Sequence, residues 1–209
     1  MKRIVVLGGG ESGVGTALLA KQKEFEVFVS DKGEITKKYK EVLLNNEIEF
    51  EENQHSEAKV LNADLVMKSP GIPDHVPLVD KLKQNSIPVI SEIEFASQFT
   101  DAKIVGITGS NGKTTTAMLT HHVLKAGRLN VGLAGNIGES FAAQVINQEY
   151  KSYVLELSSF QLDGIEKFAP HIAVITNITP DHLDRYNYDF NKYIDSKFRI
   201  TKNQTNKDY

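Results

Sequence analysis

Short apolar runs alternate with longer stretches of mixed polarity along the first 90 residues of the chain. A short run that is apolar on both faces is typical of a strand buried inside a parallel sheet. The apolar runs predict strands at 4–7, 26–29, 48–50, 63–67 and 89–90, and the stretches between them predict helices at 14–21, 37–45 and 76–84. Ser91 can cap a further helix, with Glu94 at the reciprocal position of a capping box. This alternation predicts one small doubly wound domain.

The same alternation starts again near residue 100. Apolar runs predict strands at 104–107, 131–134, 153–157 and 171–176, helices are expected at 113–126 and 190–200, and a polar tail follows at 201–209. We therefore expect an α/β chain with one domain at residues 1–93 and a second at residues 94–209.

A glycine-rich turn joins the strand at 104–107 to the helix after it, with the sequence Thr108-Gly109-Ser110-Asn111-Gly112-Lys113-Thr114-Thr115. A turn between strand and helix directs backbone N–H groups and the positive end of the helix dipole at one small volume, which suits a polyphosphate. Lys113 can reach the β- and γ-phosphates, and the Thr114 hydroxyl can reach a bound Mg²⁺. The turn departs from the strict Walker spacing, because Ile107 stands where that pattern requires glycine. It still predicts binding of ATP or GTP.

A second glycine turn follows the first predicted strand. Gly8, Gly10 and Gly13 satisfy the pattern G-x-G-x-x-G, and Asp31 stands just after the second strand. This is the fingerprint of a Rossmann-like dinucleotide-binding unit, which holds a diphosphate at a helix N-terminus. The pattern by itself favours NAD, although the same turn can hold any diphosphate.

Polar residues also follow later strands. Ser69 and Gly71 lie in a Lys-Ser-Pro-Gly-Ile-Pro loop at the ligand edge of the first sheet, although Ser-Pro-Gly by itself indicates only a tight turn. Glu156 is embedded in an apolar strand, where a carboxylate is costly unless it meets a cation, and Mg²⁺ is the natural one. The alternative for Glu156 is an ion pair or exposure on the outer face of the strand.

Four other residues have ordinary explanations when each is taken alone. A lone loop histidine such as His182 is usually solvated. Asp184 and Arg185 are expected to form a local salt bridge, and Lys197 is expected to be a solvated lysine on its helix.

Bulk composition restricts the partners. The chain of 209 residues is 40% hydrophobic and 24% charged, as in ordinary globular proteins, and its net charge of −3 gives no electrostatic case for nucleic acid or an anionic membrane. It has no cysteine, which excludes disulfides and thiolate metal sites and suits a reducing cytoplasm. No apolar run approaches the roughly 20 residues of a spanning helix, and residues 1–8 do not form a signal peptide. We expect a cytoplasmic monomer.

Five segments stand in the order found in one enzyme family. They are the turn at 108–114, Gly135-Asn136-Ile137-Gly138, the Leu-Glu-Leu-Ser-Ser-Phe-Gln-Leu run at 155–162, the Asp-His-Leu-Asp-Arg-Tyr run at 181–186 and Ser196-Lys197-Phe198-Arg199. Together with the loop at 68–72 they resemble the Mur ligases of peptidoglycan precursor synthesis, over essentially the whole chain. The segments at 136–138 and 157–162 favour the D-glutamate-adding member over its alanine-, diaminopimelate- and dipeptide-adding relatives.

The resemblance implies an ATP-dependent amide ligation. The carboxylate of UDP-N-acetylmuramoyl-L-alanine would take the γ-phosphate as an acyl phosphate, and the amine of D-glutamate would then displace phosphate. ATP would lie on residues 109–115, with Lys113 on its β- and γ-phosphates. Thr114 and Glu156 would hold one Mg²⁺, and His182 with a carbamylated Lys197 would hold a second.

The resemblance also implies a binding path for the UDP-linked substrate. The residues that would line it are Glu11, Ser12, Gly13 and Asp31 in the first domain, Ser69 and Gly71 near the diphosphate, and Asn136, Ser158, Gln161 and His182 beyond it. After Asp31 this chain has Lys32-Gly33 where better-known relatives have Thr-Arg, so the contacts to uracil stay open.

The family has three domains. We therefore expect this chain to hold the Rossmann-like UDP-binding domain and a truncated P-loop NTPase-type central domain, without the C-terminal D-glutamate-binding domain, and to be inactive as a ligase by itself. Three alternatives stand beside this interpretation. They are an NAD-type Rossmann module fused to a P-loop, a folylpolyglutamate-synthase-like ligase, against which residues 1–90 argue, and a generic P-loop NTPase switch.

Overall fold

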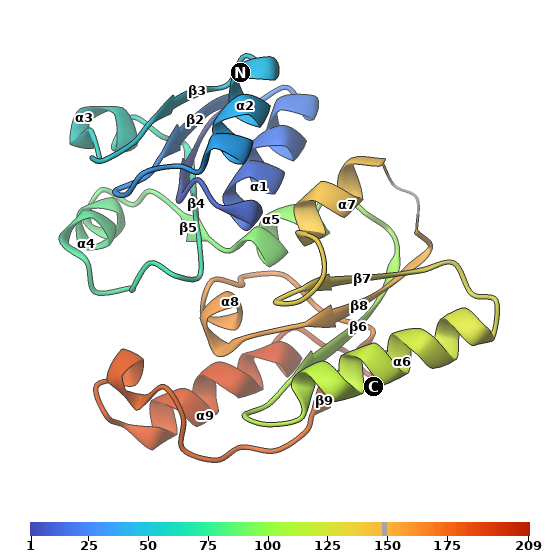
Figure 1. The fold of residues 1–209 in the computed structure, drawn as a ribbon. Helices are drawn as coiled ribbons and strands as arrows, with labels where there is room; N and C mark the ends of the chain where they lie inside the picture. The colour runs from blue at the N-terminus through green and yellow to red at the C-terminus, as the bar shows by residue number, and fades with distance from the viewer. Residues whose placement is uncertain (148–149) are drawn as a thin grey trace.

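The computed structural model describes residues 1–147 and 150–209, and it contains two parallel sheets (Figure 1). The first has the strand order β3-β2-β1-β4-β5. Its strands are β1 (Arg3–Leu7), β2 (Glu26–Ser30), β3 (Glu49–Glu51), β4 (Leu65–Lys68) and β5 (Val89–Ile90). From β1 the chain goes to β2 on one side of that strand, and it later returns to place β4 on the other side of β1. A ligand site is expected beyond the carboxyl ends of such strands, at this change of direction.

Helices cover both faces of this sheet. On one face α1 (Glu11–Gln22), α2 (Lys37–Asn45) and α5 (Glu92–Ser97) pack on side chains such as Ile4, Val6 and Val29. On the other face α3 (Glu57–Val60) and α4 (Pro77–Gln84) pack on Val5 and Phe28. The predicted doubly wound domain is therefore confirmed.

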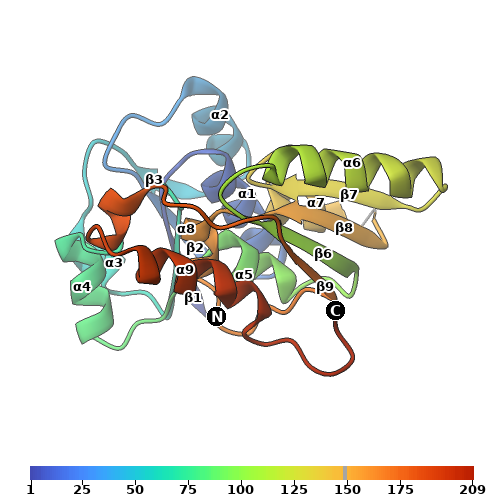
Figure 2. The same cartoon turned by 90° about the horizontal axis from the view of Figure 1, so that it is seen from below.

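The second sheet has the order β7-β8-β6-β9, with its own change of direction between β6 and β9. Its strands are β6 (Lys103–Thr108), β7 (Val131–Gly135), β8 (Ser152–Glu156) and β9 (Ile172–Ile175). The helix α6 (Lys113–Ala126) lies along its outer face (Figure 1), and Ala117 is buried there with Ile107 and Val154. The inner side carries α7 (Phe141–Asn147) and α8 (Ser159–Asp163), and α9 (Phe190–Phe198) packs on α8 (Figure 2). Two short 3₁₀ turns flank α9, at Leu183–Tyr186 and Arg199–Thr201.

One hydrophobic cluster joins the two sheets. It runs from Ile4 and Val6 in β1, through α1, α5 and α7, to Tyr153 and Leu155 in β8. The ring of Phe141 meets that of Tyr153 edge-on at 5.0 Å. The expected domain boundary between residues 93 and 94 falls within α5, so the two lobes share a core at the point where the chain passes between them.

The predicted elements are present with small shifts of their ends, and α3, α7 and α8 were not predicted. The Ser91 cap is confirmed, since its Oγ accepts from the Glu94 amide at 3.3 Å. The other predicted hydrogen bond of the capping box, from the Ser91 amide to the Glu94 side chain, is wrong. The Glu94 carboxylate accepts instead from the amides of residues 166–168. Leaving a buried amide unpaired costs about 1–3 kcal/mol of folding free energy, so the amides of residues 166–168 compete strongly for the Glu94 carboxylate.

The polar tail ends on the second sheet. Tyr209 N donates to His171 O at 2.9 Å, and Ala173 N donates to Tyr209 O at 2.7 Å, so the tail covers part of the free edge of β9. In the described ranges every helix is too short or too polar to cross a bilayer.

Candidate active site

The phosphate-type turn between β6 and α6 is shaped by two glycines. Gly109 and Gly112 have φ values of +143° and +80°, a backbone region that favours glycine, and a Cβ on Gly109 would collide with Thr176. The Ser110 amide donates to Asn177 O at 2.9 Å, and the Asn111 amide donates to Asn177 Oδ1 at 3.1 Å. These two predicted nucleotide contacts therefore use their N–H groups within the protein.

The next four amides, at residues 112–115, have no acceptor among the residues that the structure describes. They form the first turn of α6, where the helix dipole is positive. The free donors of the turn are thus those of Gly112, Lys113, Thr114 and Thr115.

Glu156 ends β8 beside this turn and is 1% exposed. Its Oε2 accepts from Thr114 Oγ1 at 2.8 Å, and its Oε1 accepts from Asn136 Nδ2 at 2.9 Å. Within the described part of the chain, no basic side chain forms an ion pair with it. A buried carboxylate next to a hydroxyl provides the hard oxygen atoms that Mg²⁺ prefers.

Lys197, in α9, is only 2% exposed, so the expectation of a solvated lysine is wrong. Its Nζ lies 3.4 Å from Thr108 Oγ1 and 5.1 Å from the centre of the Tyr193 ring. Burial, followed by repulsion from Lys113, lowers the pKa of the ammonium group to about 8. Part of the amine is therefore uncharged near neutral pH, as reaction with CO₂ requires.

Lys113 and His182 make their contacts away from the carboxylate of Glu156. Lys113 Nζ donates to Ser110 O at 2.8 Å, across its own turn. His182 has a φ of +48°, its side chain is half exposed, and its ring lies 5.3 Å from that of Phe160. Among the residues described, no hydrogen bond or ion pair joins His182 to Glu156 or Lys197. The structure therefore brings Thr114, Glu156 and Asn136 together, and it does not bring His182 to them.

A cavity of about 880 Å³ opens beyond the carboxyl ends of β1, β2 and β4. Of the predicted substrate residues it is lined by Glu11, Ser12, Asp31, Ser69 and Gly71. Asp31 also shapes the turn, because its carboxylate accepts from the amides of Gly9 at 2.6 Å and Gly33 at 2.7 Å.

Gly13, which was predicted with these residues, does not line the cavity. A Cβ on Gly13 would collide with Gly8 O, so this glycine lets α1 pack against the turn. Ser158 and Gln161 cap α8 as a capping box, and Gln161 is 2% exposed. Their place on a substrate path stays a prediction, as does that of Asn136.

Arg185 makes a contact that was not predicted. Its guanidinium donates to Pro70 O at 3.2 Å and to Gly71 O at 3.4 Å, and it stacks 4.3 Å from the centre of the Phe160 ring. It therefore joins the second lobe to the loop of the first, and the predicted pair with Asp184 is not formed. The pattern of apolar and polar residues could not predict this contact, because the partners of Arg185 are backbone oxygens more than 100 residues away.

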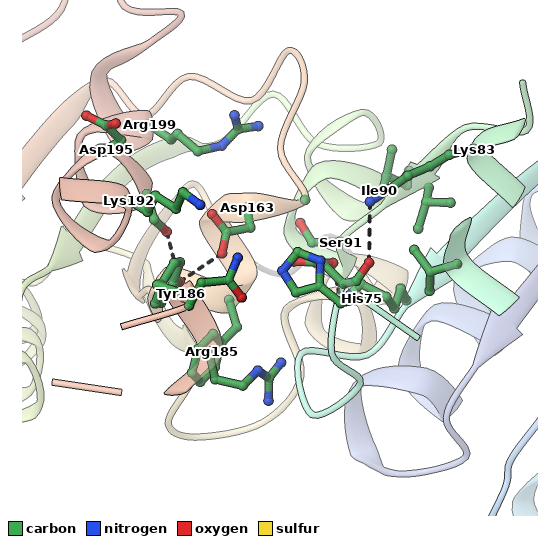
Figure 3. Close-up of a pocket in the computed structure, with 18 residues that line it drawn as sticks. His75, Lys83, Ile90, Ser91, Asp163, Arg185, Tyr186, Lys192, Asp195 and Arg199 are labelled. Atoms are coloured by element: carbon green, nitrogen blue, oxygen red, sulfur yellow. Dashed lines mark hydrogen bonds and ion pairs between the residues drawn. The ribbon is translucent and has the colours of Figure 1, made fainter. Parts of the chain in front are cut away.

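A second cavity of about 510 Å³ lies between the lobes and is lined in part by Arg185 (Figure 3). His75 and Ser91 of the first lobe line it opposite Asp163 and Tyr186 of the second. Tyr186 Oη donates to Asp163 Oδ2 at 2.8 Å, and burial raises the pKa of the Asp163 carboxyl.

Two family models match the chain. Residues 3–77 match the MurD N-terminal domain, and residues 107–209 match the Mur ligase middle domain. The chain belongs to the Mur ligase family. The predicted resemblance is thereby confirmed, and the glycine turn at residues 8–13 falls in the N-terminal Mur domain.

Two named relatives share about three fifths of their aligned residues with this Mur ligase chain. A UDP-N-acetylmuramoylalanine–D-glutamate ligase of Christiangramia forsetii is 62% identical over 208 residues, and one of Bacteroides thetaiotaomicron is 60% identical. Each alignment covers 100% of this chain and 47% of the relative. The chain thus spans about half the length of the curated relatives that it matches.

Solved Mur ligases share the fold. The UDP-N-acetylmuramate:L-alanyl-γ-D-glutamyl-meso-diaminopimelate ligase of Neisseria meningitides aligns with a TM-score of 0.65 at 22% identity, over 98% of this chain and 69% of that one. UDP-N-acetylmuramate–alanine ligase of Thermotoga maritima aligns with a TM-score of 0.59 at 24% identity, over 97% of this chain and 47% of that one. The predicted α/β fold with two lobes is confirmed.

Proposed function

We propose that this chain is the substrate- and nucleotide-binding half of an ATP-dependent ligase that joins D-glutamate to UDP-N-acetylmuramoyl-L-alanine in the cytoplasm. The observation that carries the proposal is the contact between Thr114 and Glu156, which places a hydroxyl and a buried carboxylate beside the free amides of α6. Relatives 53% to 62% identical to the chain bear the name of this ligase. Their names supply the amino acid and the UDP-linked acceptor.

ATP would lie with its phosphates on the amides of residues 112–115. The positive end of the α6 dipole favours an anion there. Lys113 would leave Ser110 O and pair with the β- and γ-phosphates, since a phosphate oxygen attracts an ammonium group more strongly than a carbonyl oxygen does.

Thr114 and Glu156 fit a magnesium ion. Both present oxygen atoms, and Glu156 is buried without a basic partner among the described residues, so a cation would compensate its charge. When bound, Mg²⁺ would neutralise charge on the phosphates. Asn136 would keep the carboxylate oriented through its amide on Oε1.

The cavity at β1 and β4 would hold the UDP group, with Ser69 and Gly71 beside the diphosphate. From there the alanyl carboxylate would reach the phosphate turn. One of its oxygens would attack the γ-phosphorus as the bond from phosphorus to the β–γ bridging oxygen breaks and ADP leaves. The neutral amine of D-glutamate would then attack the acyl carbon, lose a proton and release phosphate. The protein contributes position and charge, which dominate phosphoryl transfer.

We further propose that Lys197 and His182 serve a second metal ion. The neutral Lys197 amine would take up CO₂ and lose a proton, which converts a cation into a carbamate anion. The burial of Lys197 and its pKa of about 8 support this step. His182 would have to turn inward from its exposed position.

The test is a ligase assay on the chain in its full-length context. Release of phosphate from ATP should require both the UDP-linked acceptor and D-glutamate, and Glu156→Gln should lower the rate at least about 100-fold. Release of phosphate that needs neither substrate and survives Glu156→Gln would instead identify a P-loop switch. The 209-residue chain alone should form no amide product.

A further inference from the structure

Ser30, His55 and Glu51 form a hydrogen-bonded chain at one end of the 880 Å³ cavity. Ser30 ends β2 and Glu51 ends the neighbouring strand β3, where the two pair in register, and His55 lies in the loop before α3 and lines the cavity. Ser30 Oγ lies 2.7 Å from Glu51 Oε1 and 2.7 Å from His55 Nδ1. Ser30 is fully buried, so no solvent completes this chain.

The direction of the hydrogen bonds follows from counting protons. Burial raises the pKa of the Glu51 carboxyl, but hydrogen bonds from the Ser56 hydroxyl, the Ser56 amide and Ser30 outweigh it and lower that pKa. Glu51 is therefore a carboxylate, which only accepts. The single hydroxyl proton of Ser30 points to Glu51, because otherwise two oxygen atoms with lone pairs would face each other at 2.7 Å.

The tautomer of His55 is then determined. Ser30 Oγ has already donated its proton, so His55 Nδ1 must carry a proton and donate it to Ser30. A neutral imidazole has one N–H, so Nε2 is left as an acceptor. Burial lowers the pKa of the ring, although Asp31 and Glu51 oppose this effect while Lys32 adds to it, so the neutral form holds at pH 7. His55 lines the cavity, and within the described ranges its Nε2 has no protein partner.

This end of the cavity is tied to the glycine turn. Asp31 accepts from the Gly9 amide, its own amide donates to Glu51 O at 3.1 Å, and its carbonyl accepts from the Gln54 amide at 3.3 Å. A nucleotide whose diphosphate lies at the turn can therefore extend its base toward His55. Asn53, Gln54 and Lys32 line the same end and offer donors to ring carbonyl groups.

We propose that His55 selects uracil, by accepting the imide N3–H of the base at Nε2. This inference rests on the proposed function and adds the residue that reads the base. Cytosine presents a lone pair at N3, which would face the lone pair of Nε2. An N3-methyl group would occupy the same space and remove the donor.

The test measures binding of UDP, CDP and N3-methyl-UDP to the 209-residue chain by calorimetry. UDP should bind at least about tenfold more tightly than the other two, the usual effect of one unpaired polar group in a site. His55→Ala should reduce this ratio to about twofold or less, mainly through weaker UDP binding. His75→Ala, which changes a histidine of the other cavity, should keep the ratio.

A second measurement reports on the tautomer directly. Nitrogen NMR of the ligand-free chain should show His55 protonated at Nδ1 and unprotonated at Nε2. The opposite tautomer, or an unchanged ratio of UDP to CDP affinity in His55→Ala, would overturn this inference and leave the proposed function standing. A wild-type chain that binds no UDP would overturn both.

Discussion

The guanidinium of Arg185 donates to the backbone oxygen of Pro70 at 3.2 Å, from the second lobe to the loop after β4 in the first. The same side chain stacks on Phe160, which in turn contacts the ring of His182. The loop that borders the 880 Å³ cavity is therefore fixed to the segment that carries His182. The two lobes meet through this contact on one side and through the shared core of α1, α5 and α7 on the other.

Arg185→Ala should reduce kcat/KM for the UDP-linked acceptor about tenfold in the full-length context, because the loop at 69–73 loses its fixed position. Arg185→Lys should recover little, because an ammonium group lacks the planar face that stacks on Phe160 and the fixed fork that aims two N–H groups at the two carbonyl oxygens. Lys192→Ala removes another cation from the cavity between the lobes and should leave kcat/KM unchanged. Equal effects of Lys192→Ala and Arg185→Ala would show that only net charge matters.

The free energy of unfolding should rise with pH between about 8 and 9.5 because of Lys197. Its pKa is about 8 in the folded chain and near 10.5 when unperturbed, so in this interval the unfolded state binds the extra proton. Well below pH 8 both states hold the proton, and the unfavourable burial of the charge is present in full. Urea unfolding of the wild type and Lys197→Met at pH 7, 8.5 and 9.5 measures the difference. A constant difference across this range would contradict the lowered pKa.

Thr114→Val should weaken the binding of ATP in the presence of Mg²⁺ about tenfold or more, while binding of UDP stays unchanged. The substitution removes the hydroxyl that contacts Glu156 and keeps the size of the side chain. Fluorescent ATP and UDP titrations measure the two affinities separately. Thr116→Val, in the same helix but with its amide already bonded to Gly112 O at 3.0 Å, serves as the matched control and should keep both affinities.

Gly13→Ala should destabilise the chain by roughly 2 kcal/mol or more, because its Cβ would collide with the backbone oxygen of Gly8. Gly10→Ala, three residues earlier in the same turn, meets nothing within 4 Å and should change the free energy of unfolding by less than about 1 kcal/mol. Chemical denaturation of both variants provides the comparison. Equal losses of unfolding free energy in the two variants would indicate that any side chain at this turn destabilises the chain, whatever it contacts.

Local patterns in the sequence were sufficient to predict both parallel sheets and the helix after each glycine turn. This is possible because a buried strand, a helix and a phosphate turn are each specified by residues within about ten positions of one another. The position of Glu156 at the end of an apolar strand, next to the nucleotide strand, was predictable for the same reason.

The tertiary structure alone decided which side chains meet across the chain. Lys197 becomes a buried amine only because α9 packs beside Thr108, 89 residues away. Arg185 finds Pro70 over 115 residues, and His55 acquires its tautomer from Ser30 and Glu51 on two different strands. Burial and hydrogen-bond direction depend on all neighbours in space, and no short stretch of sequence contains those neighbours.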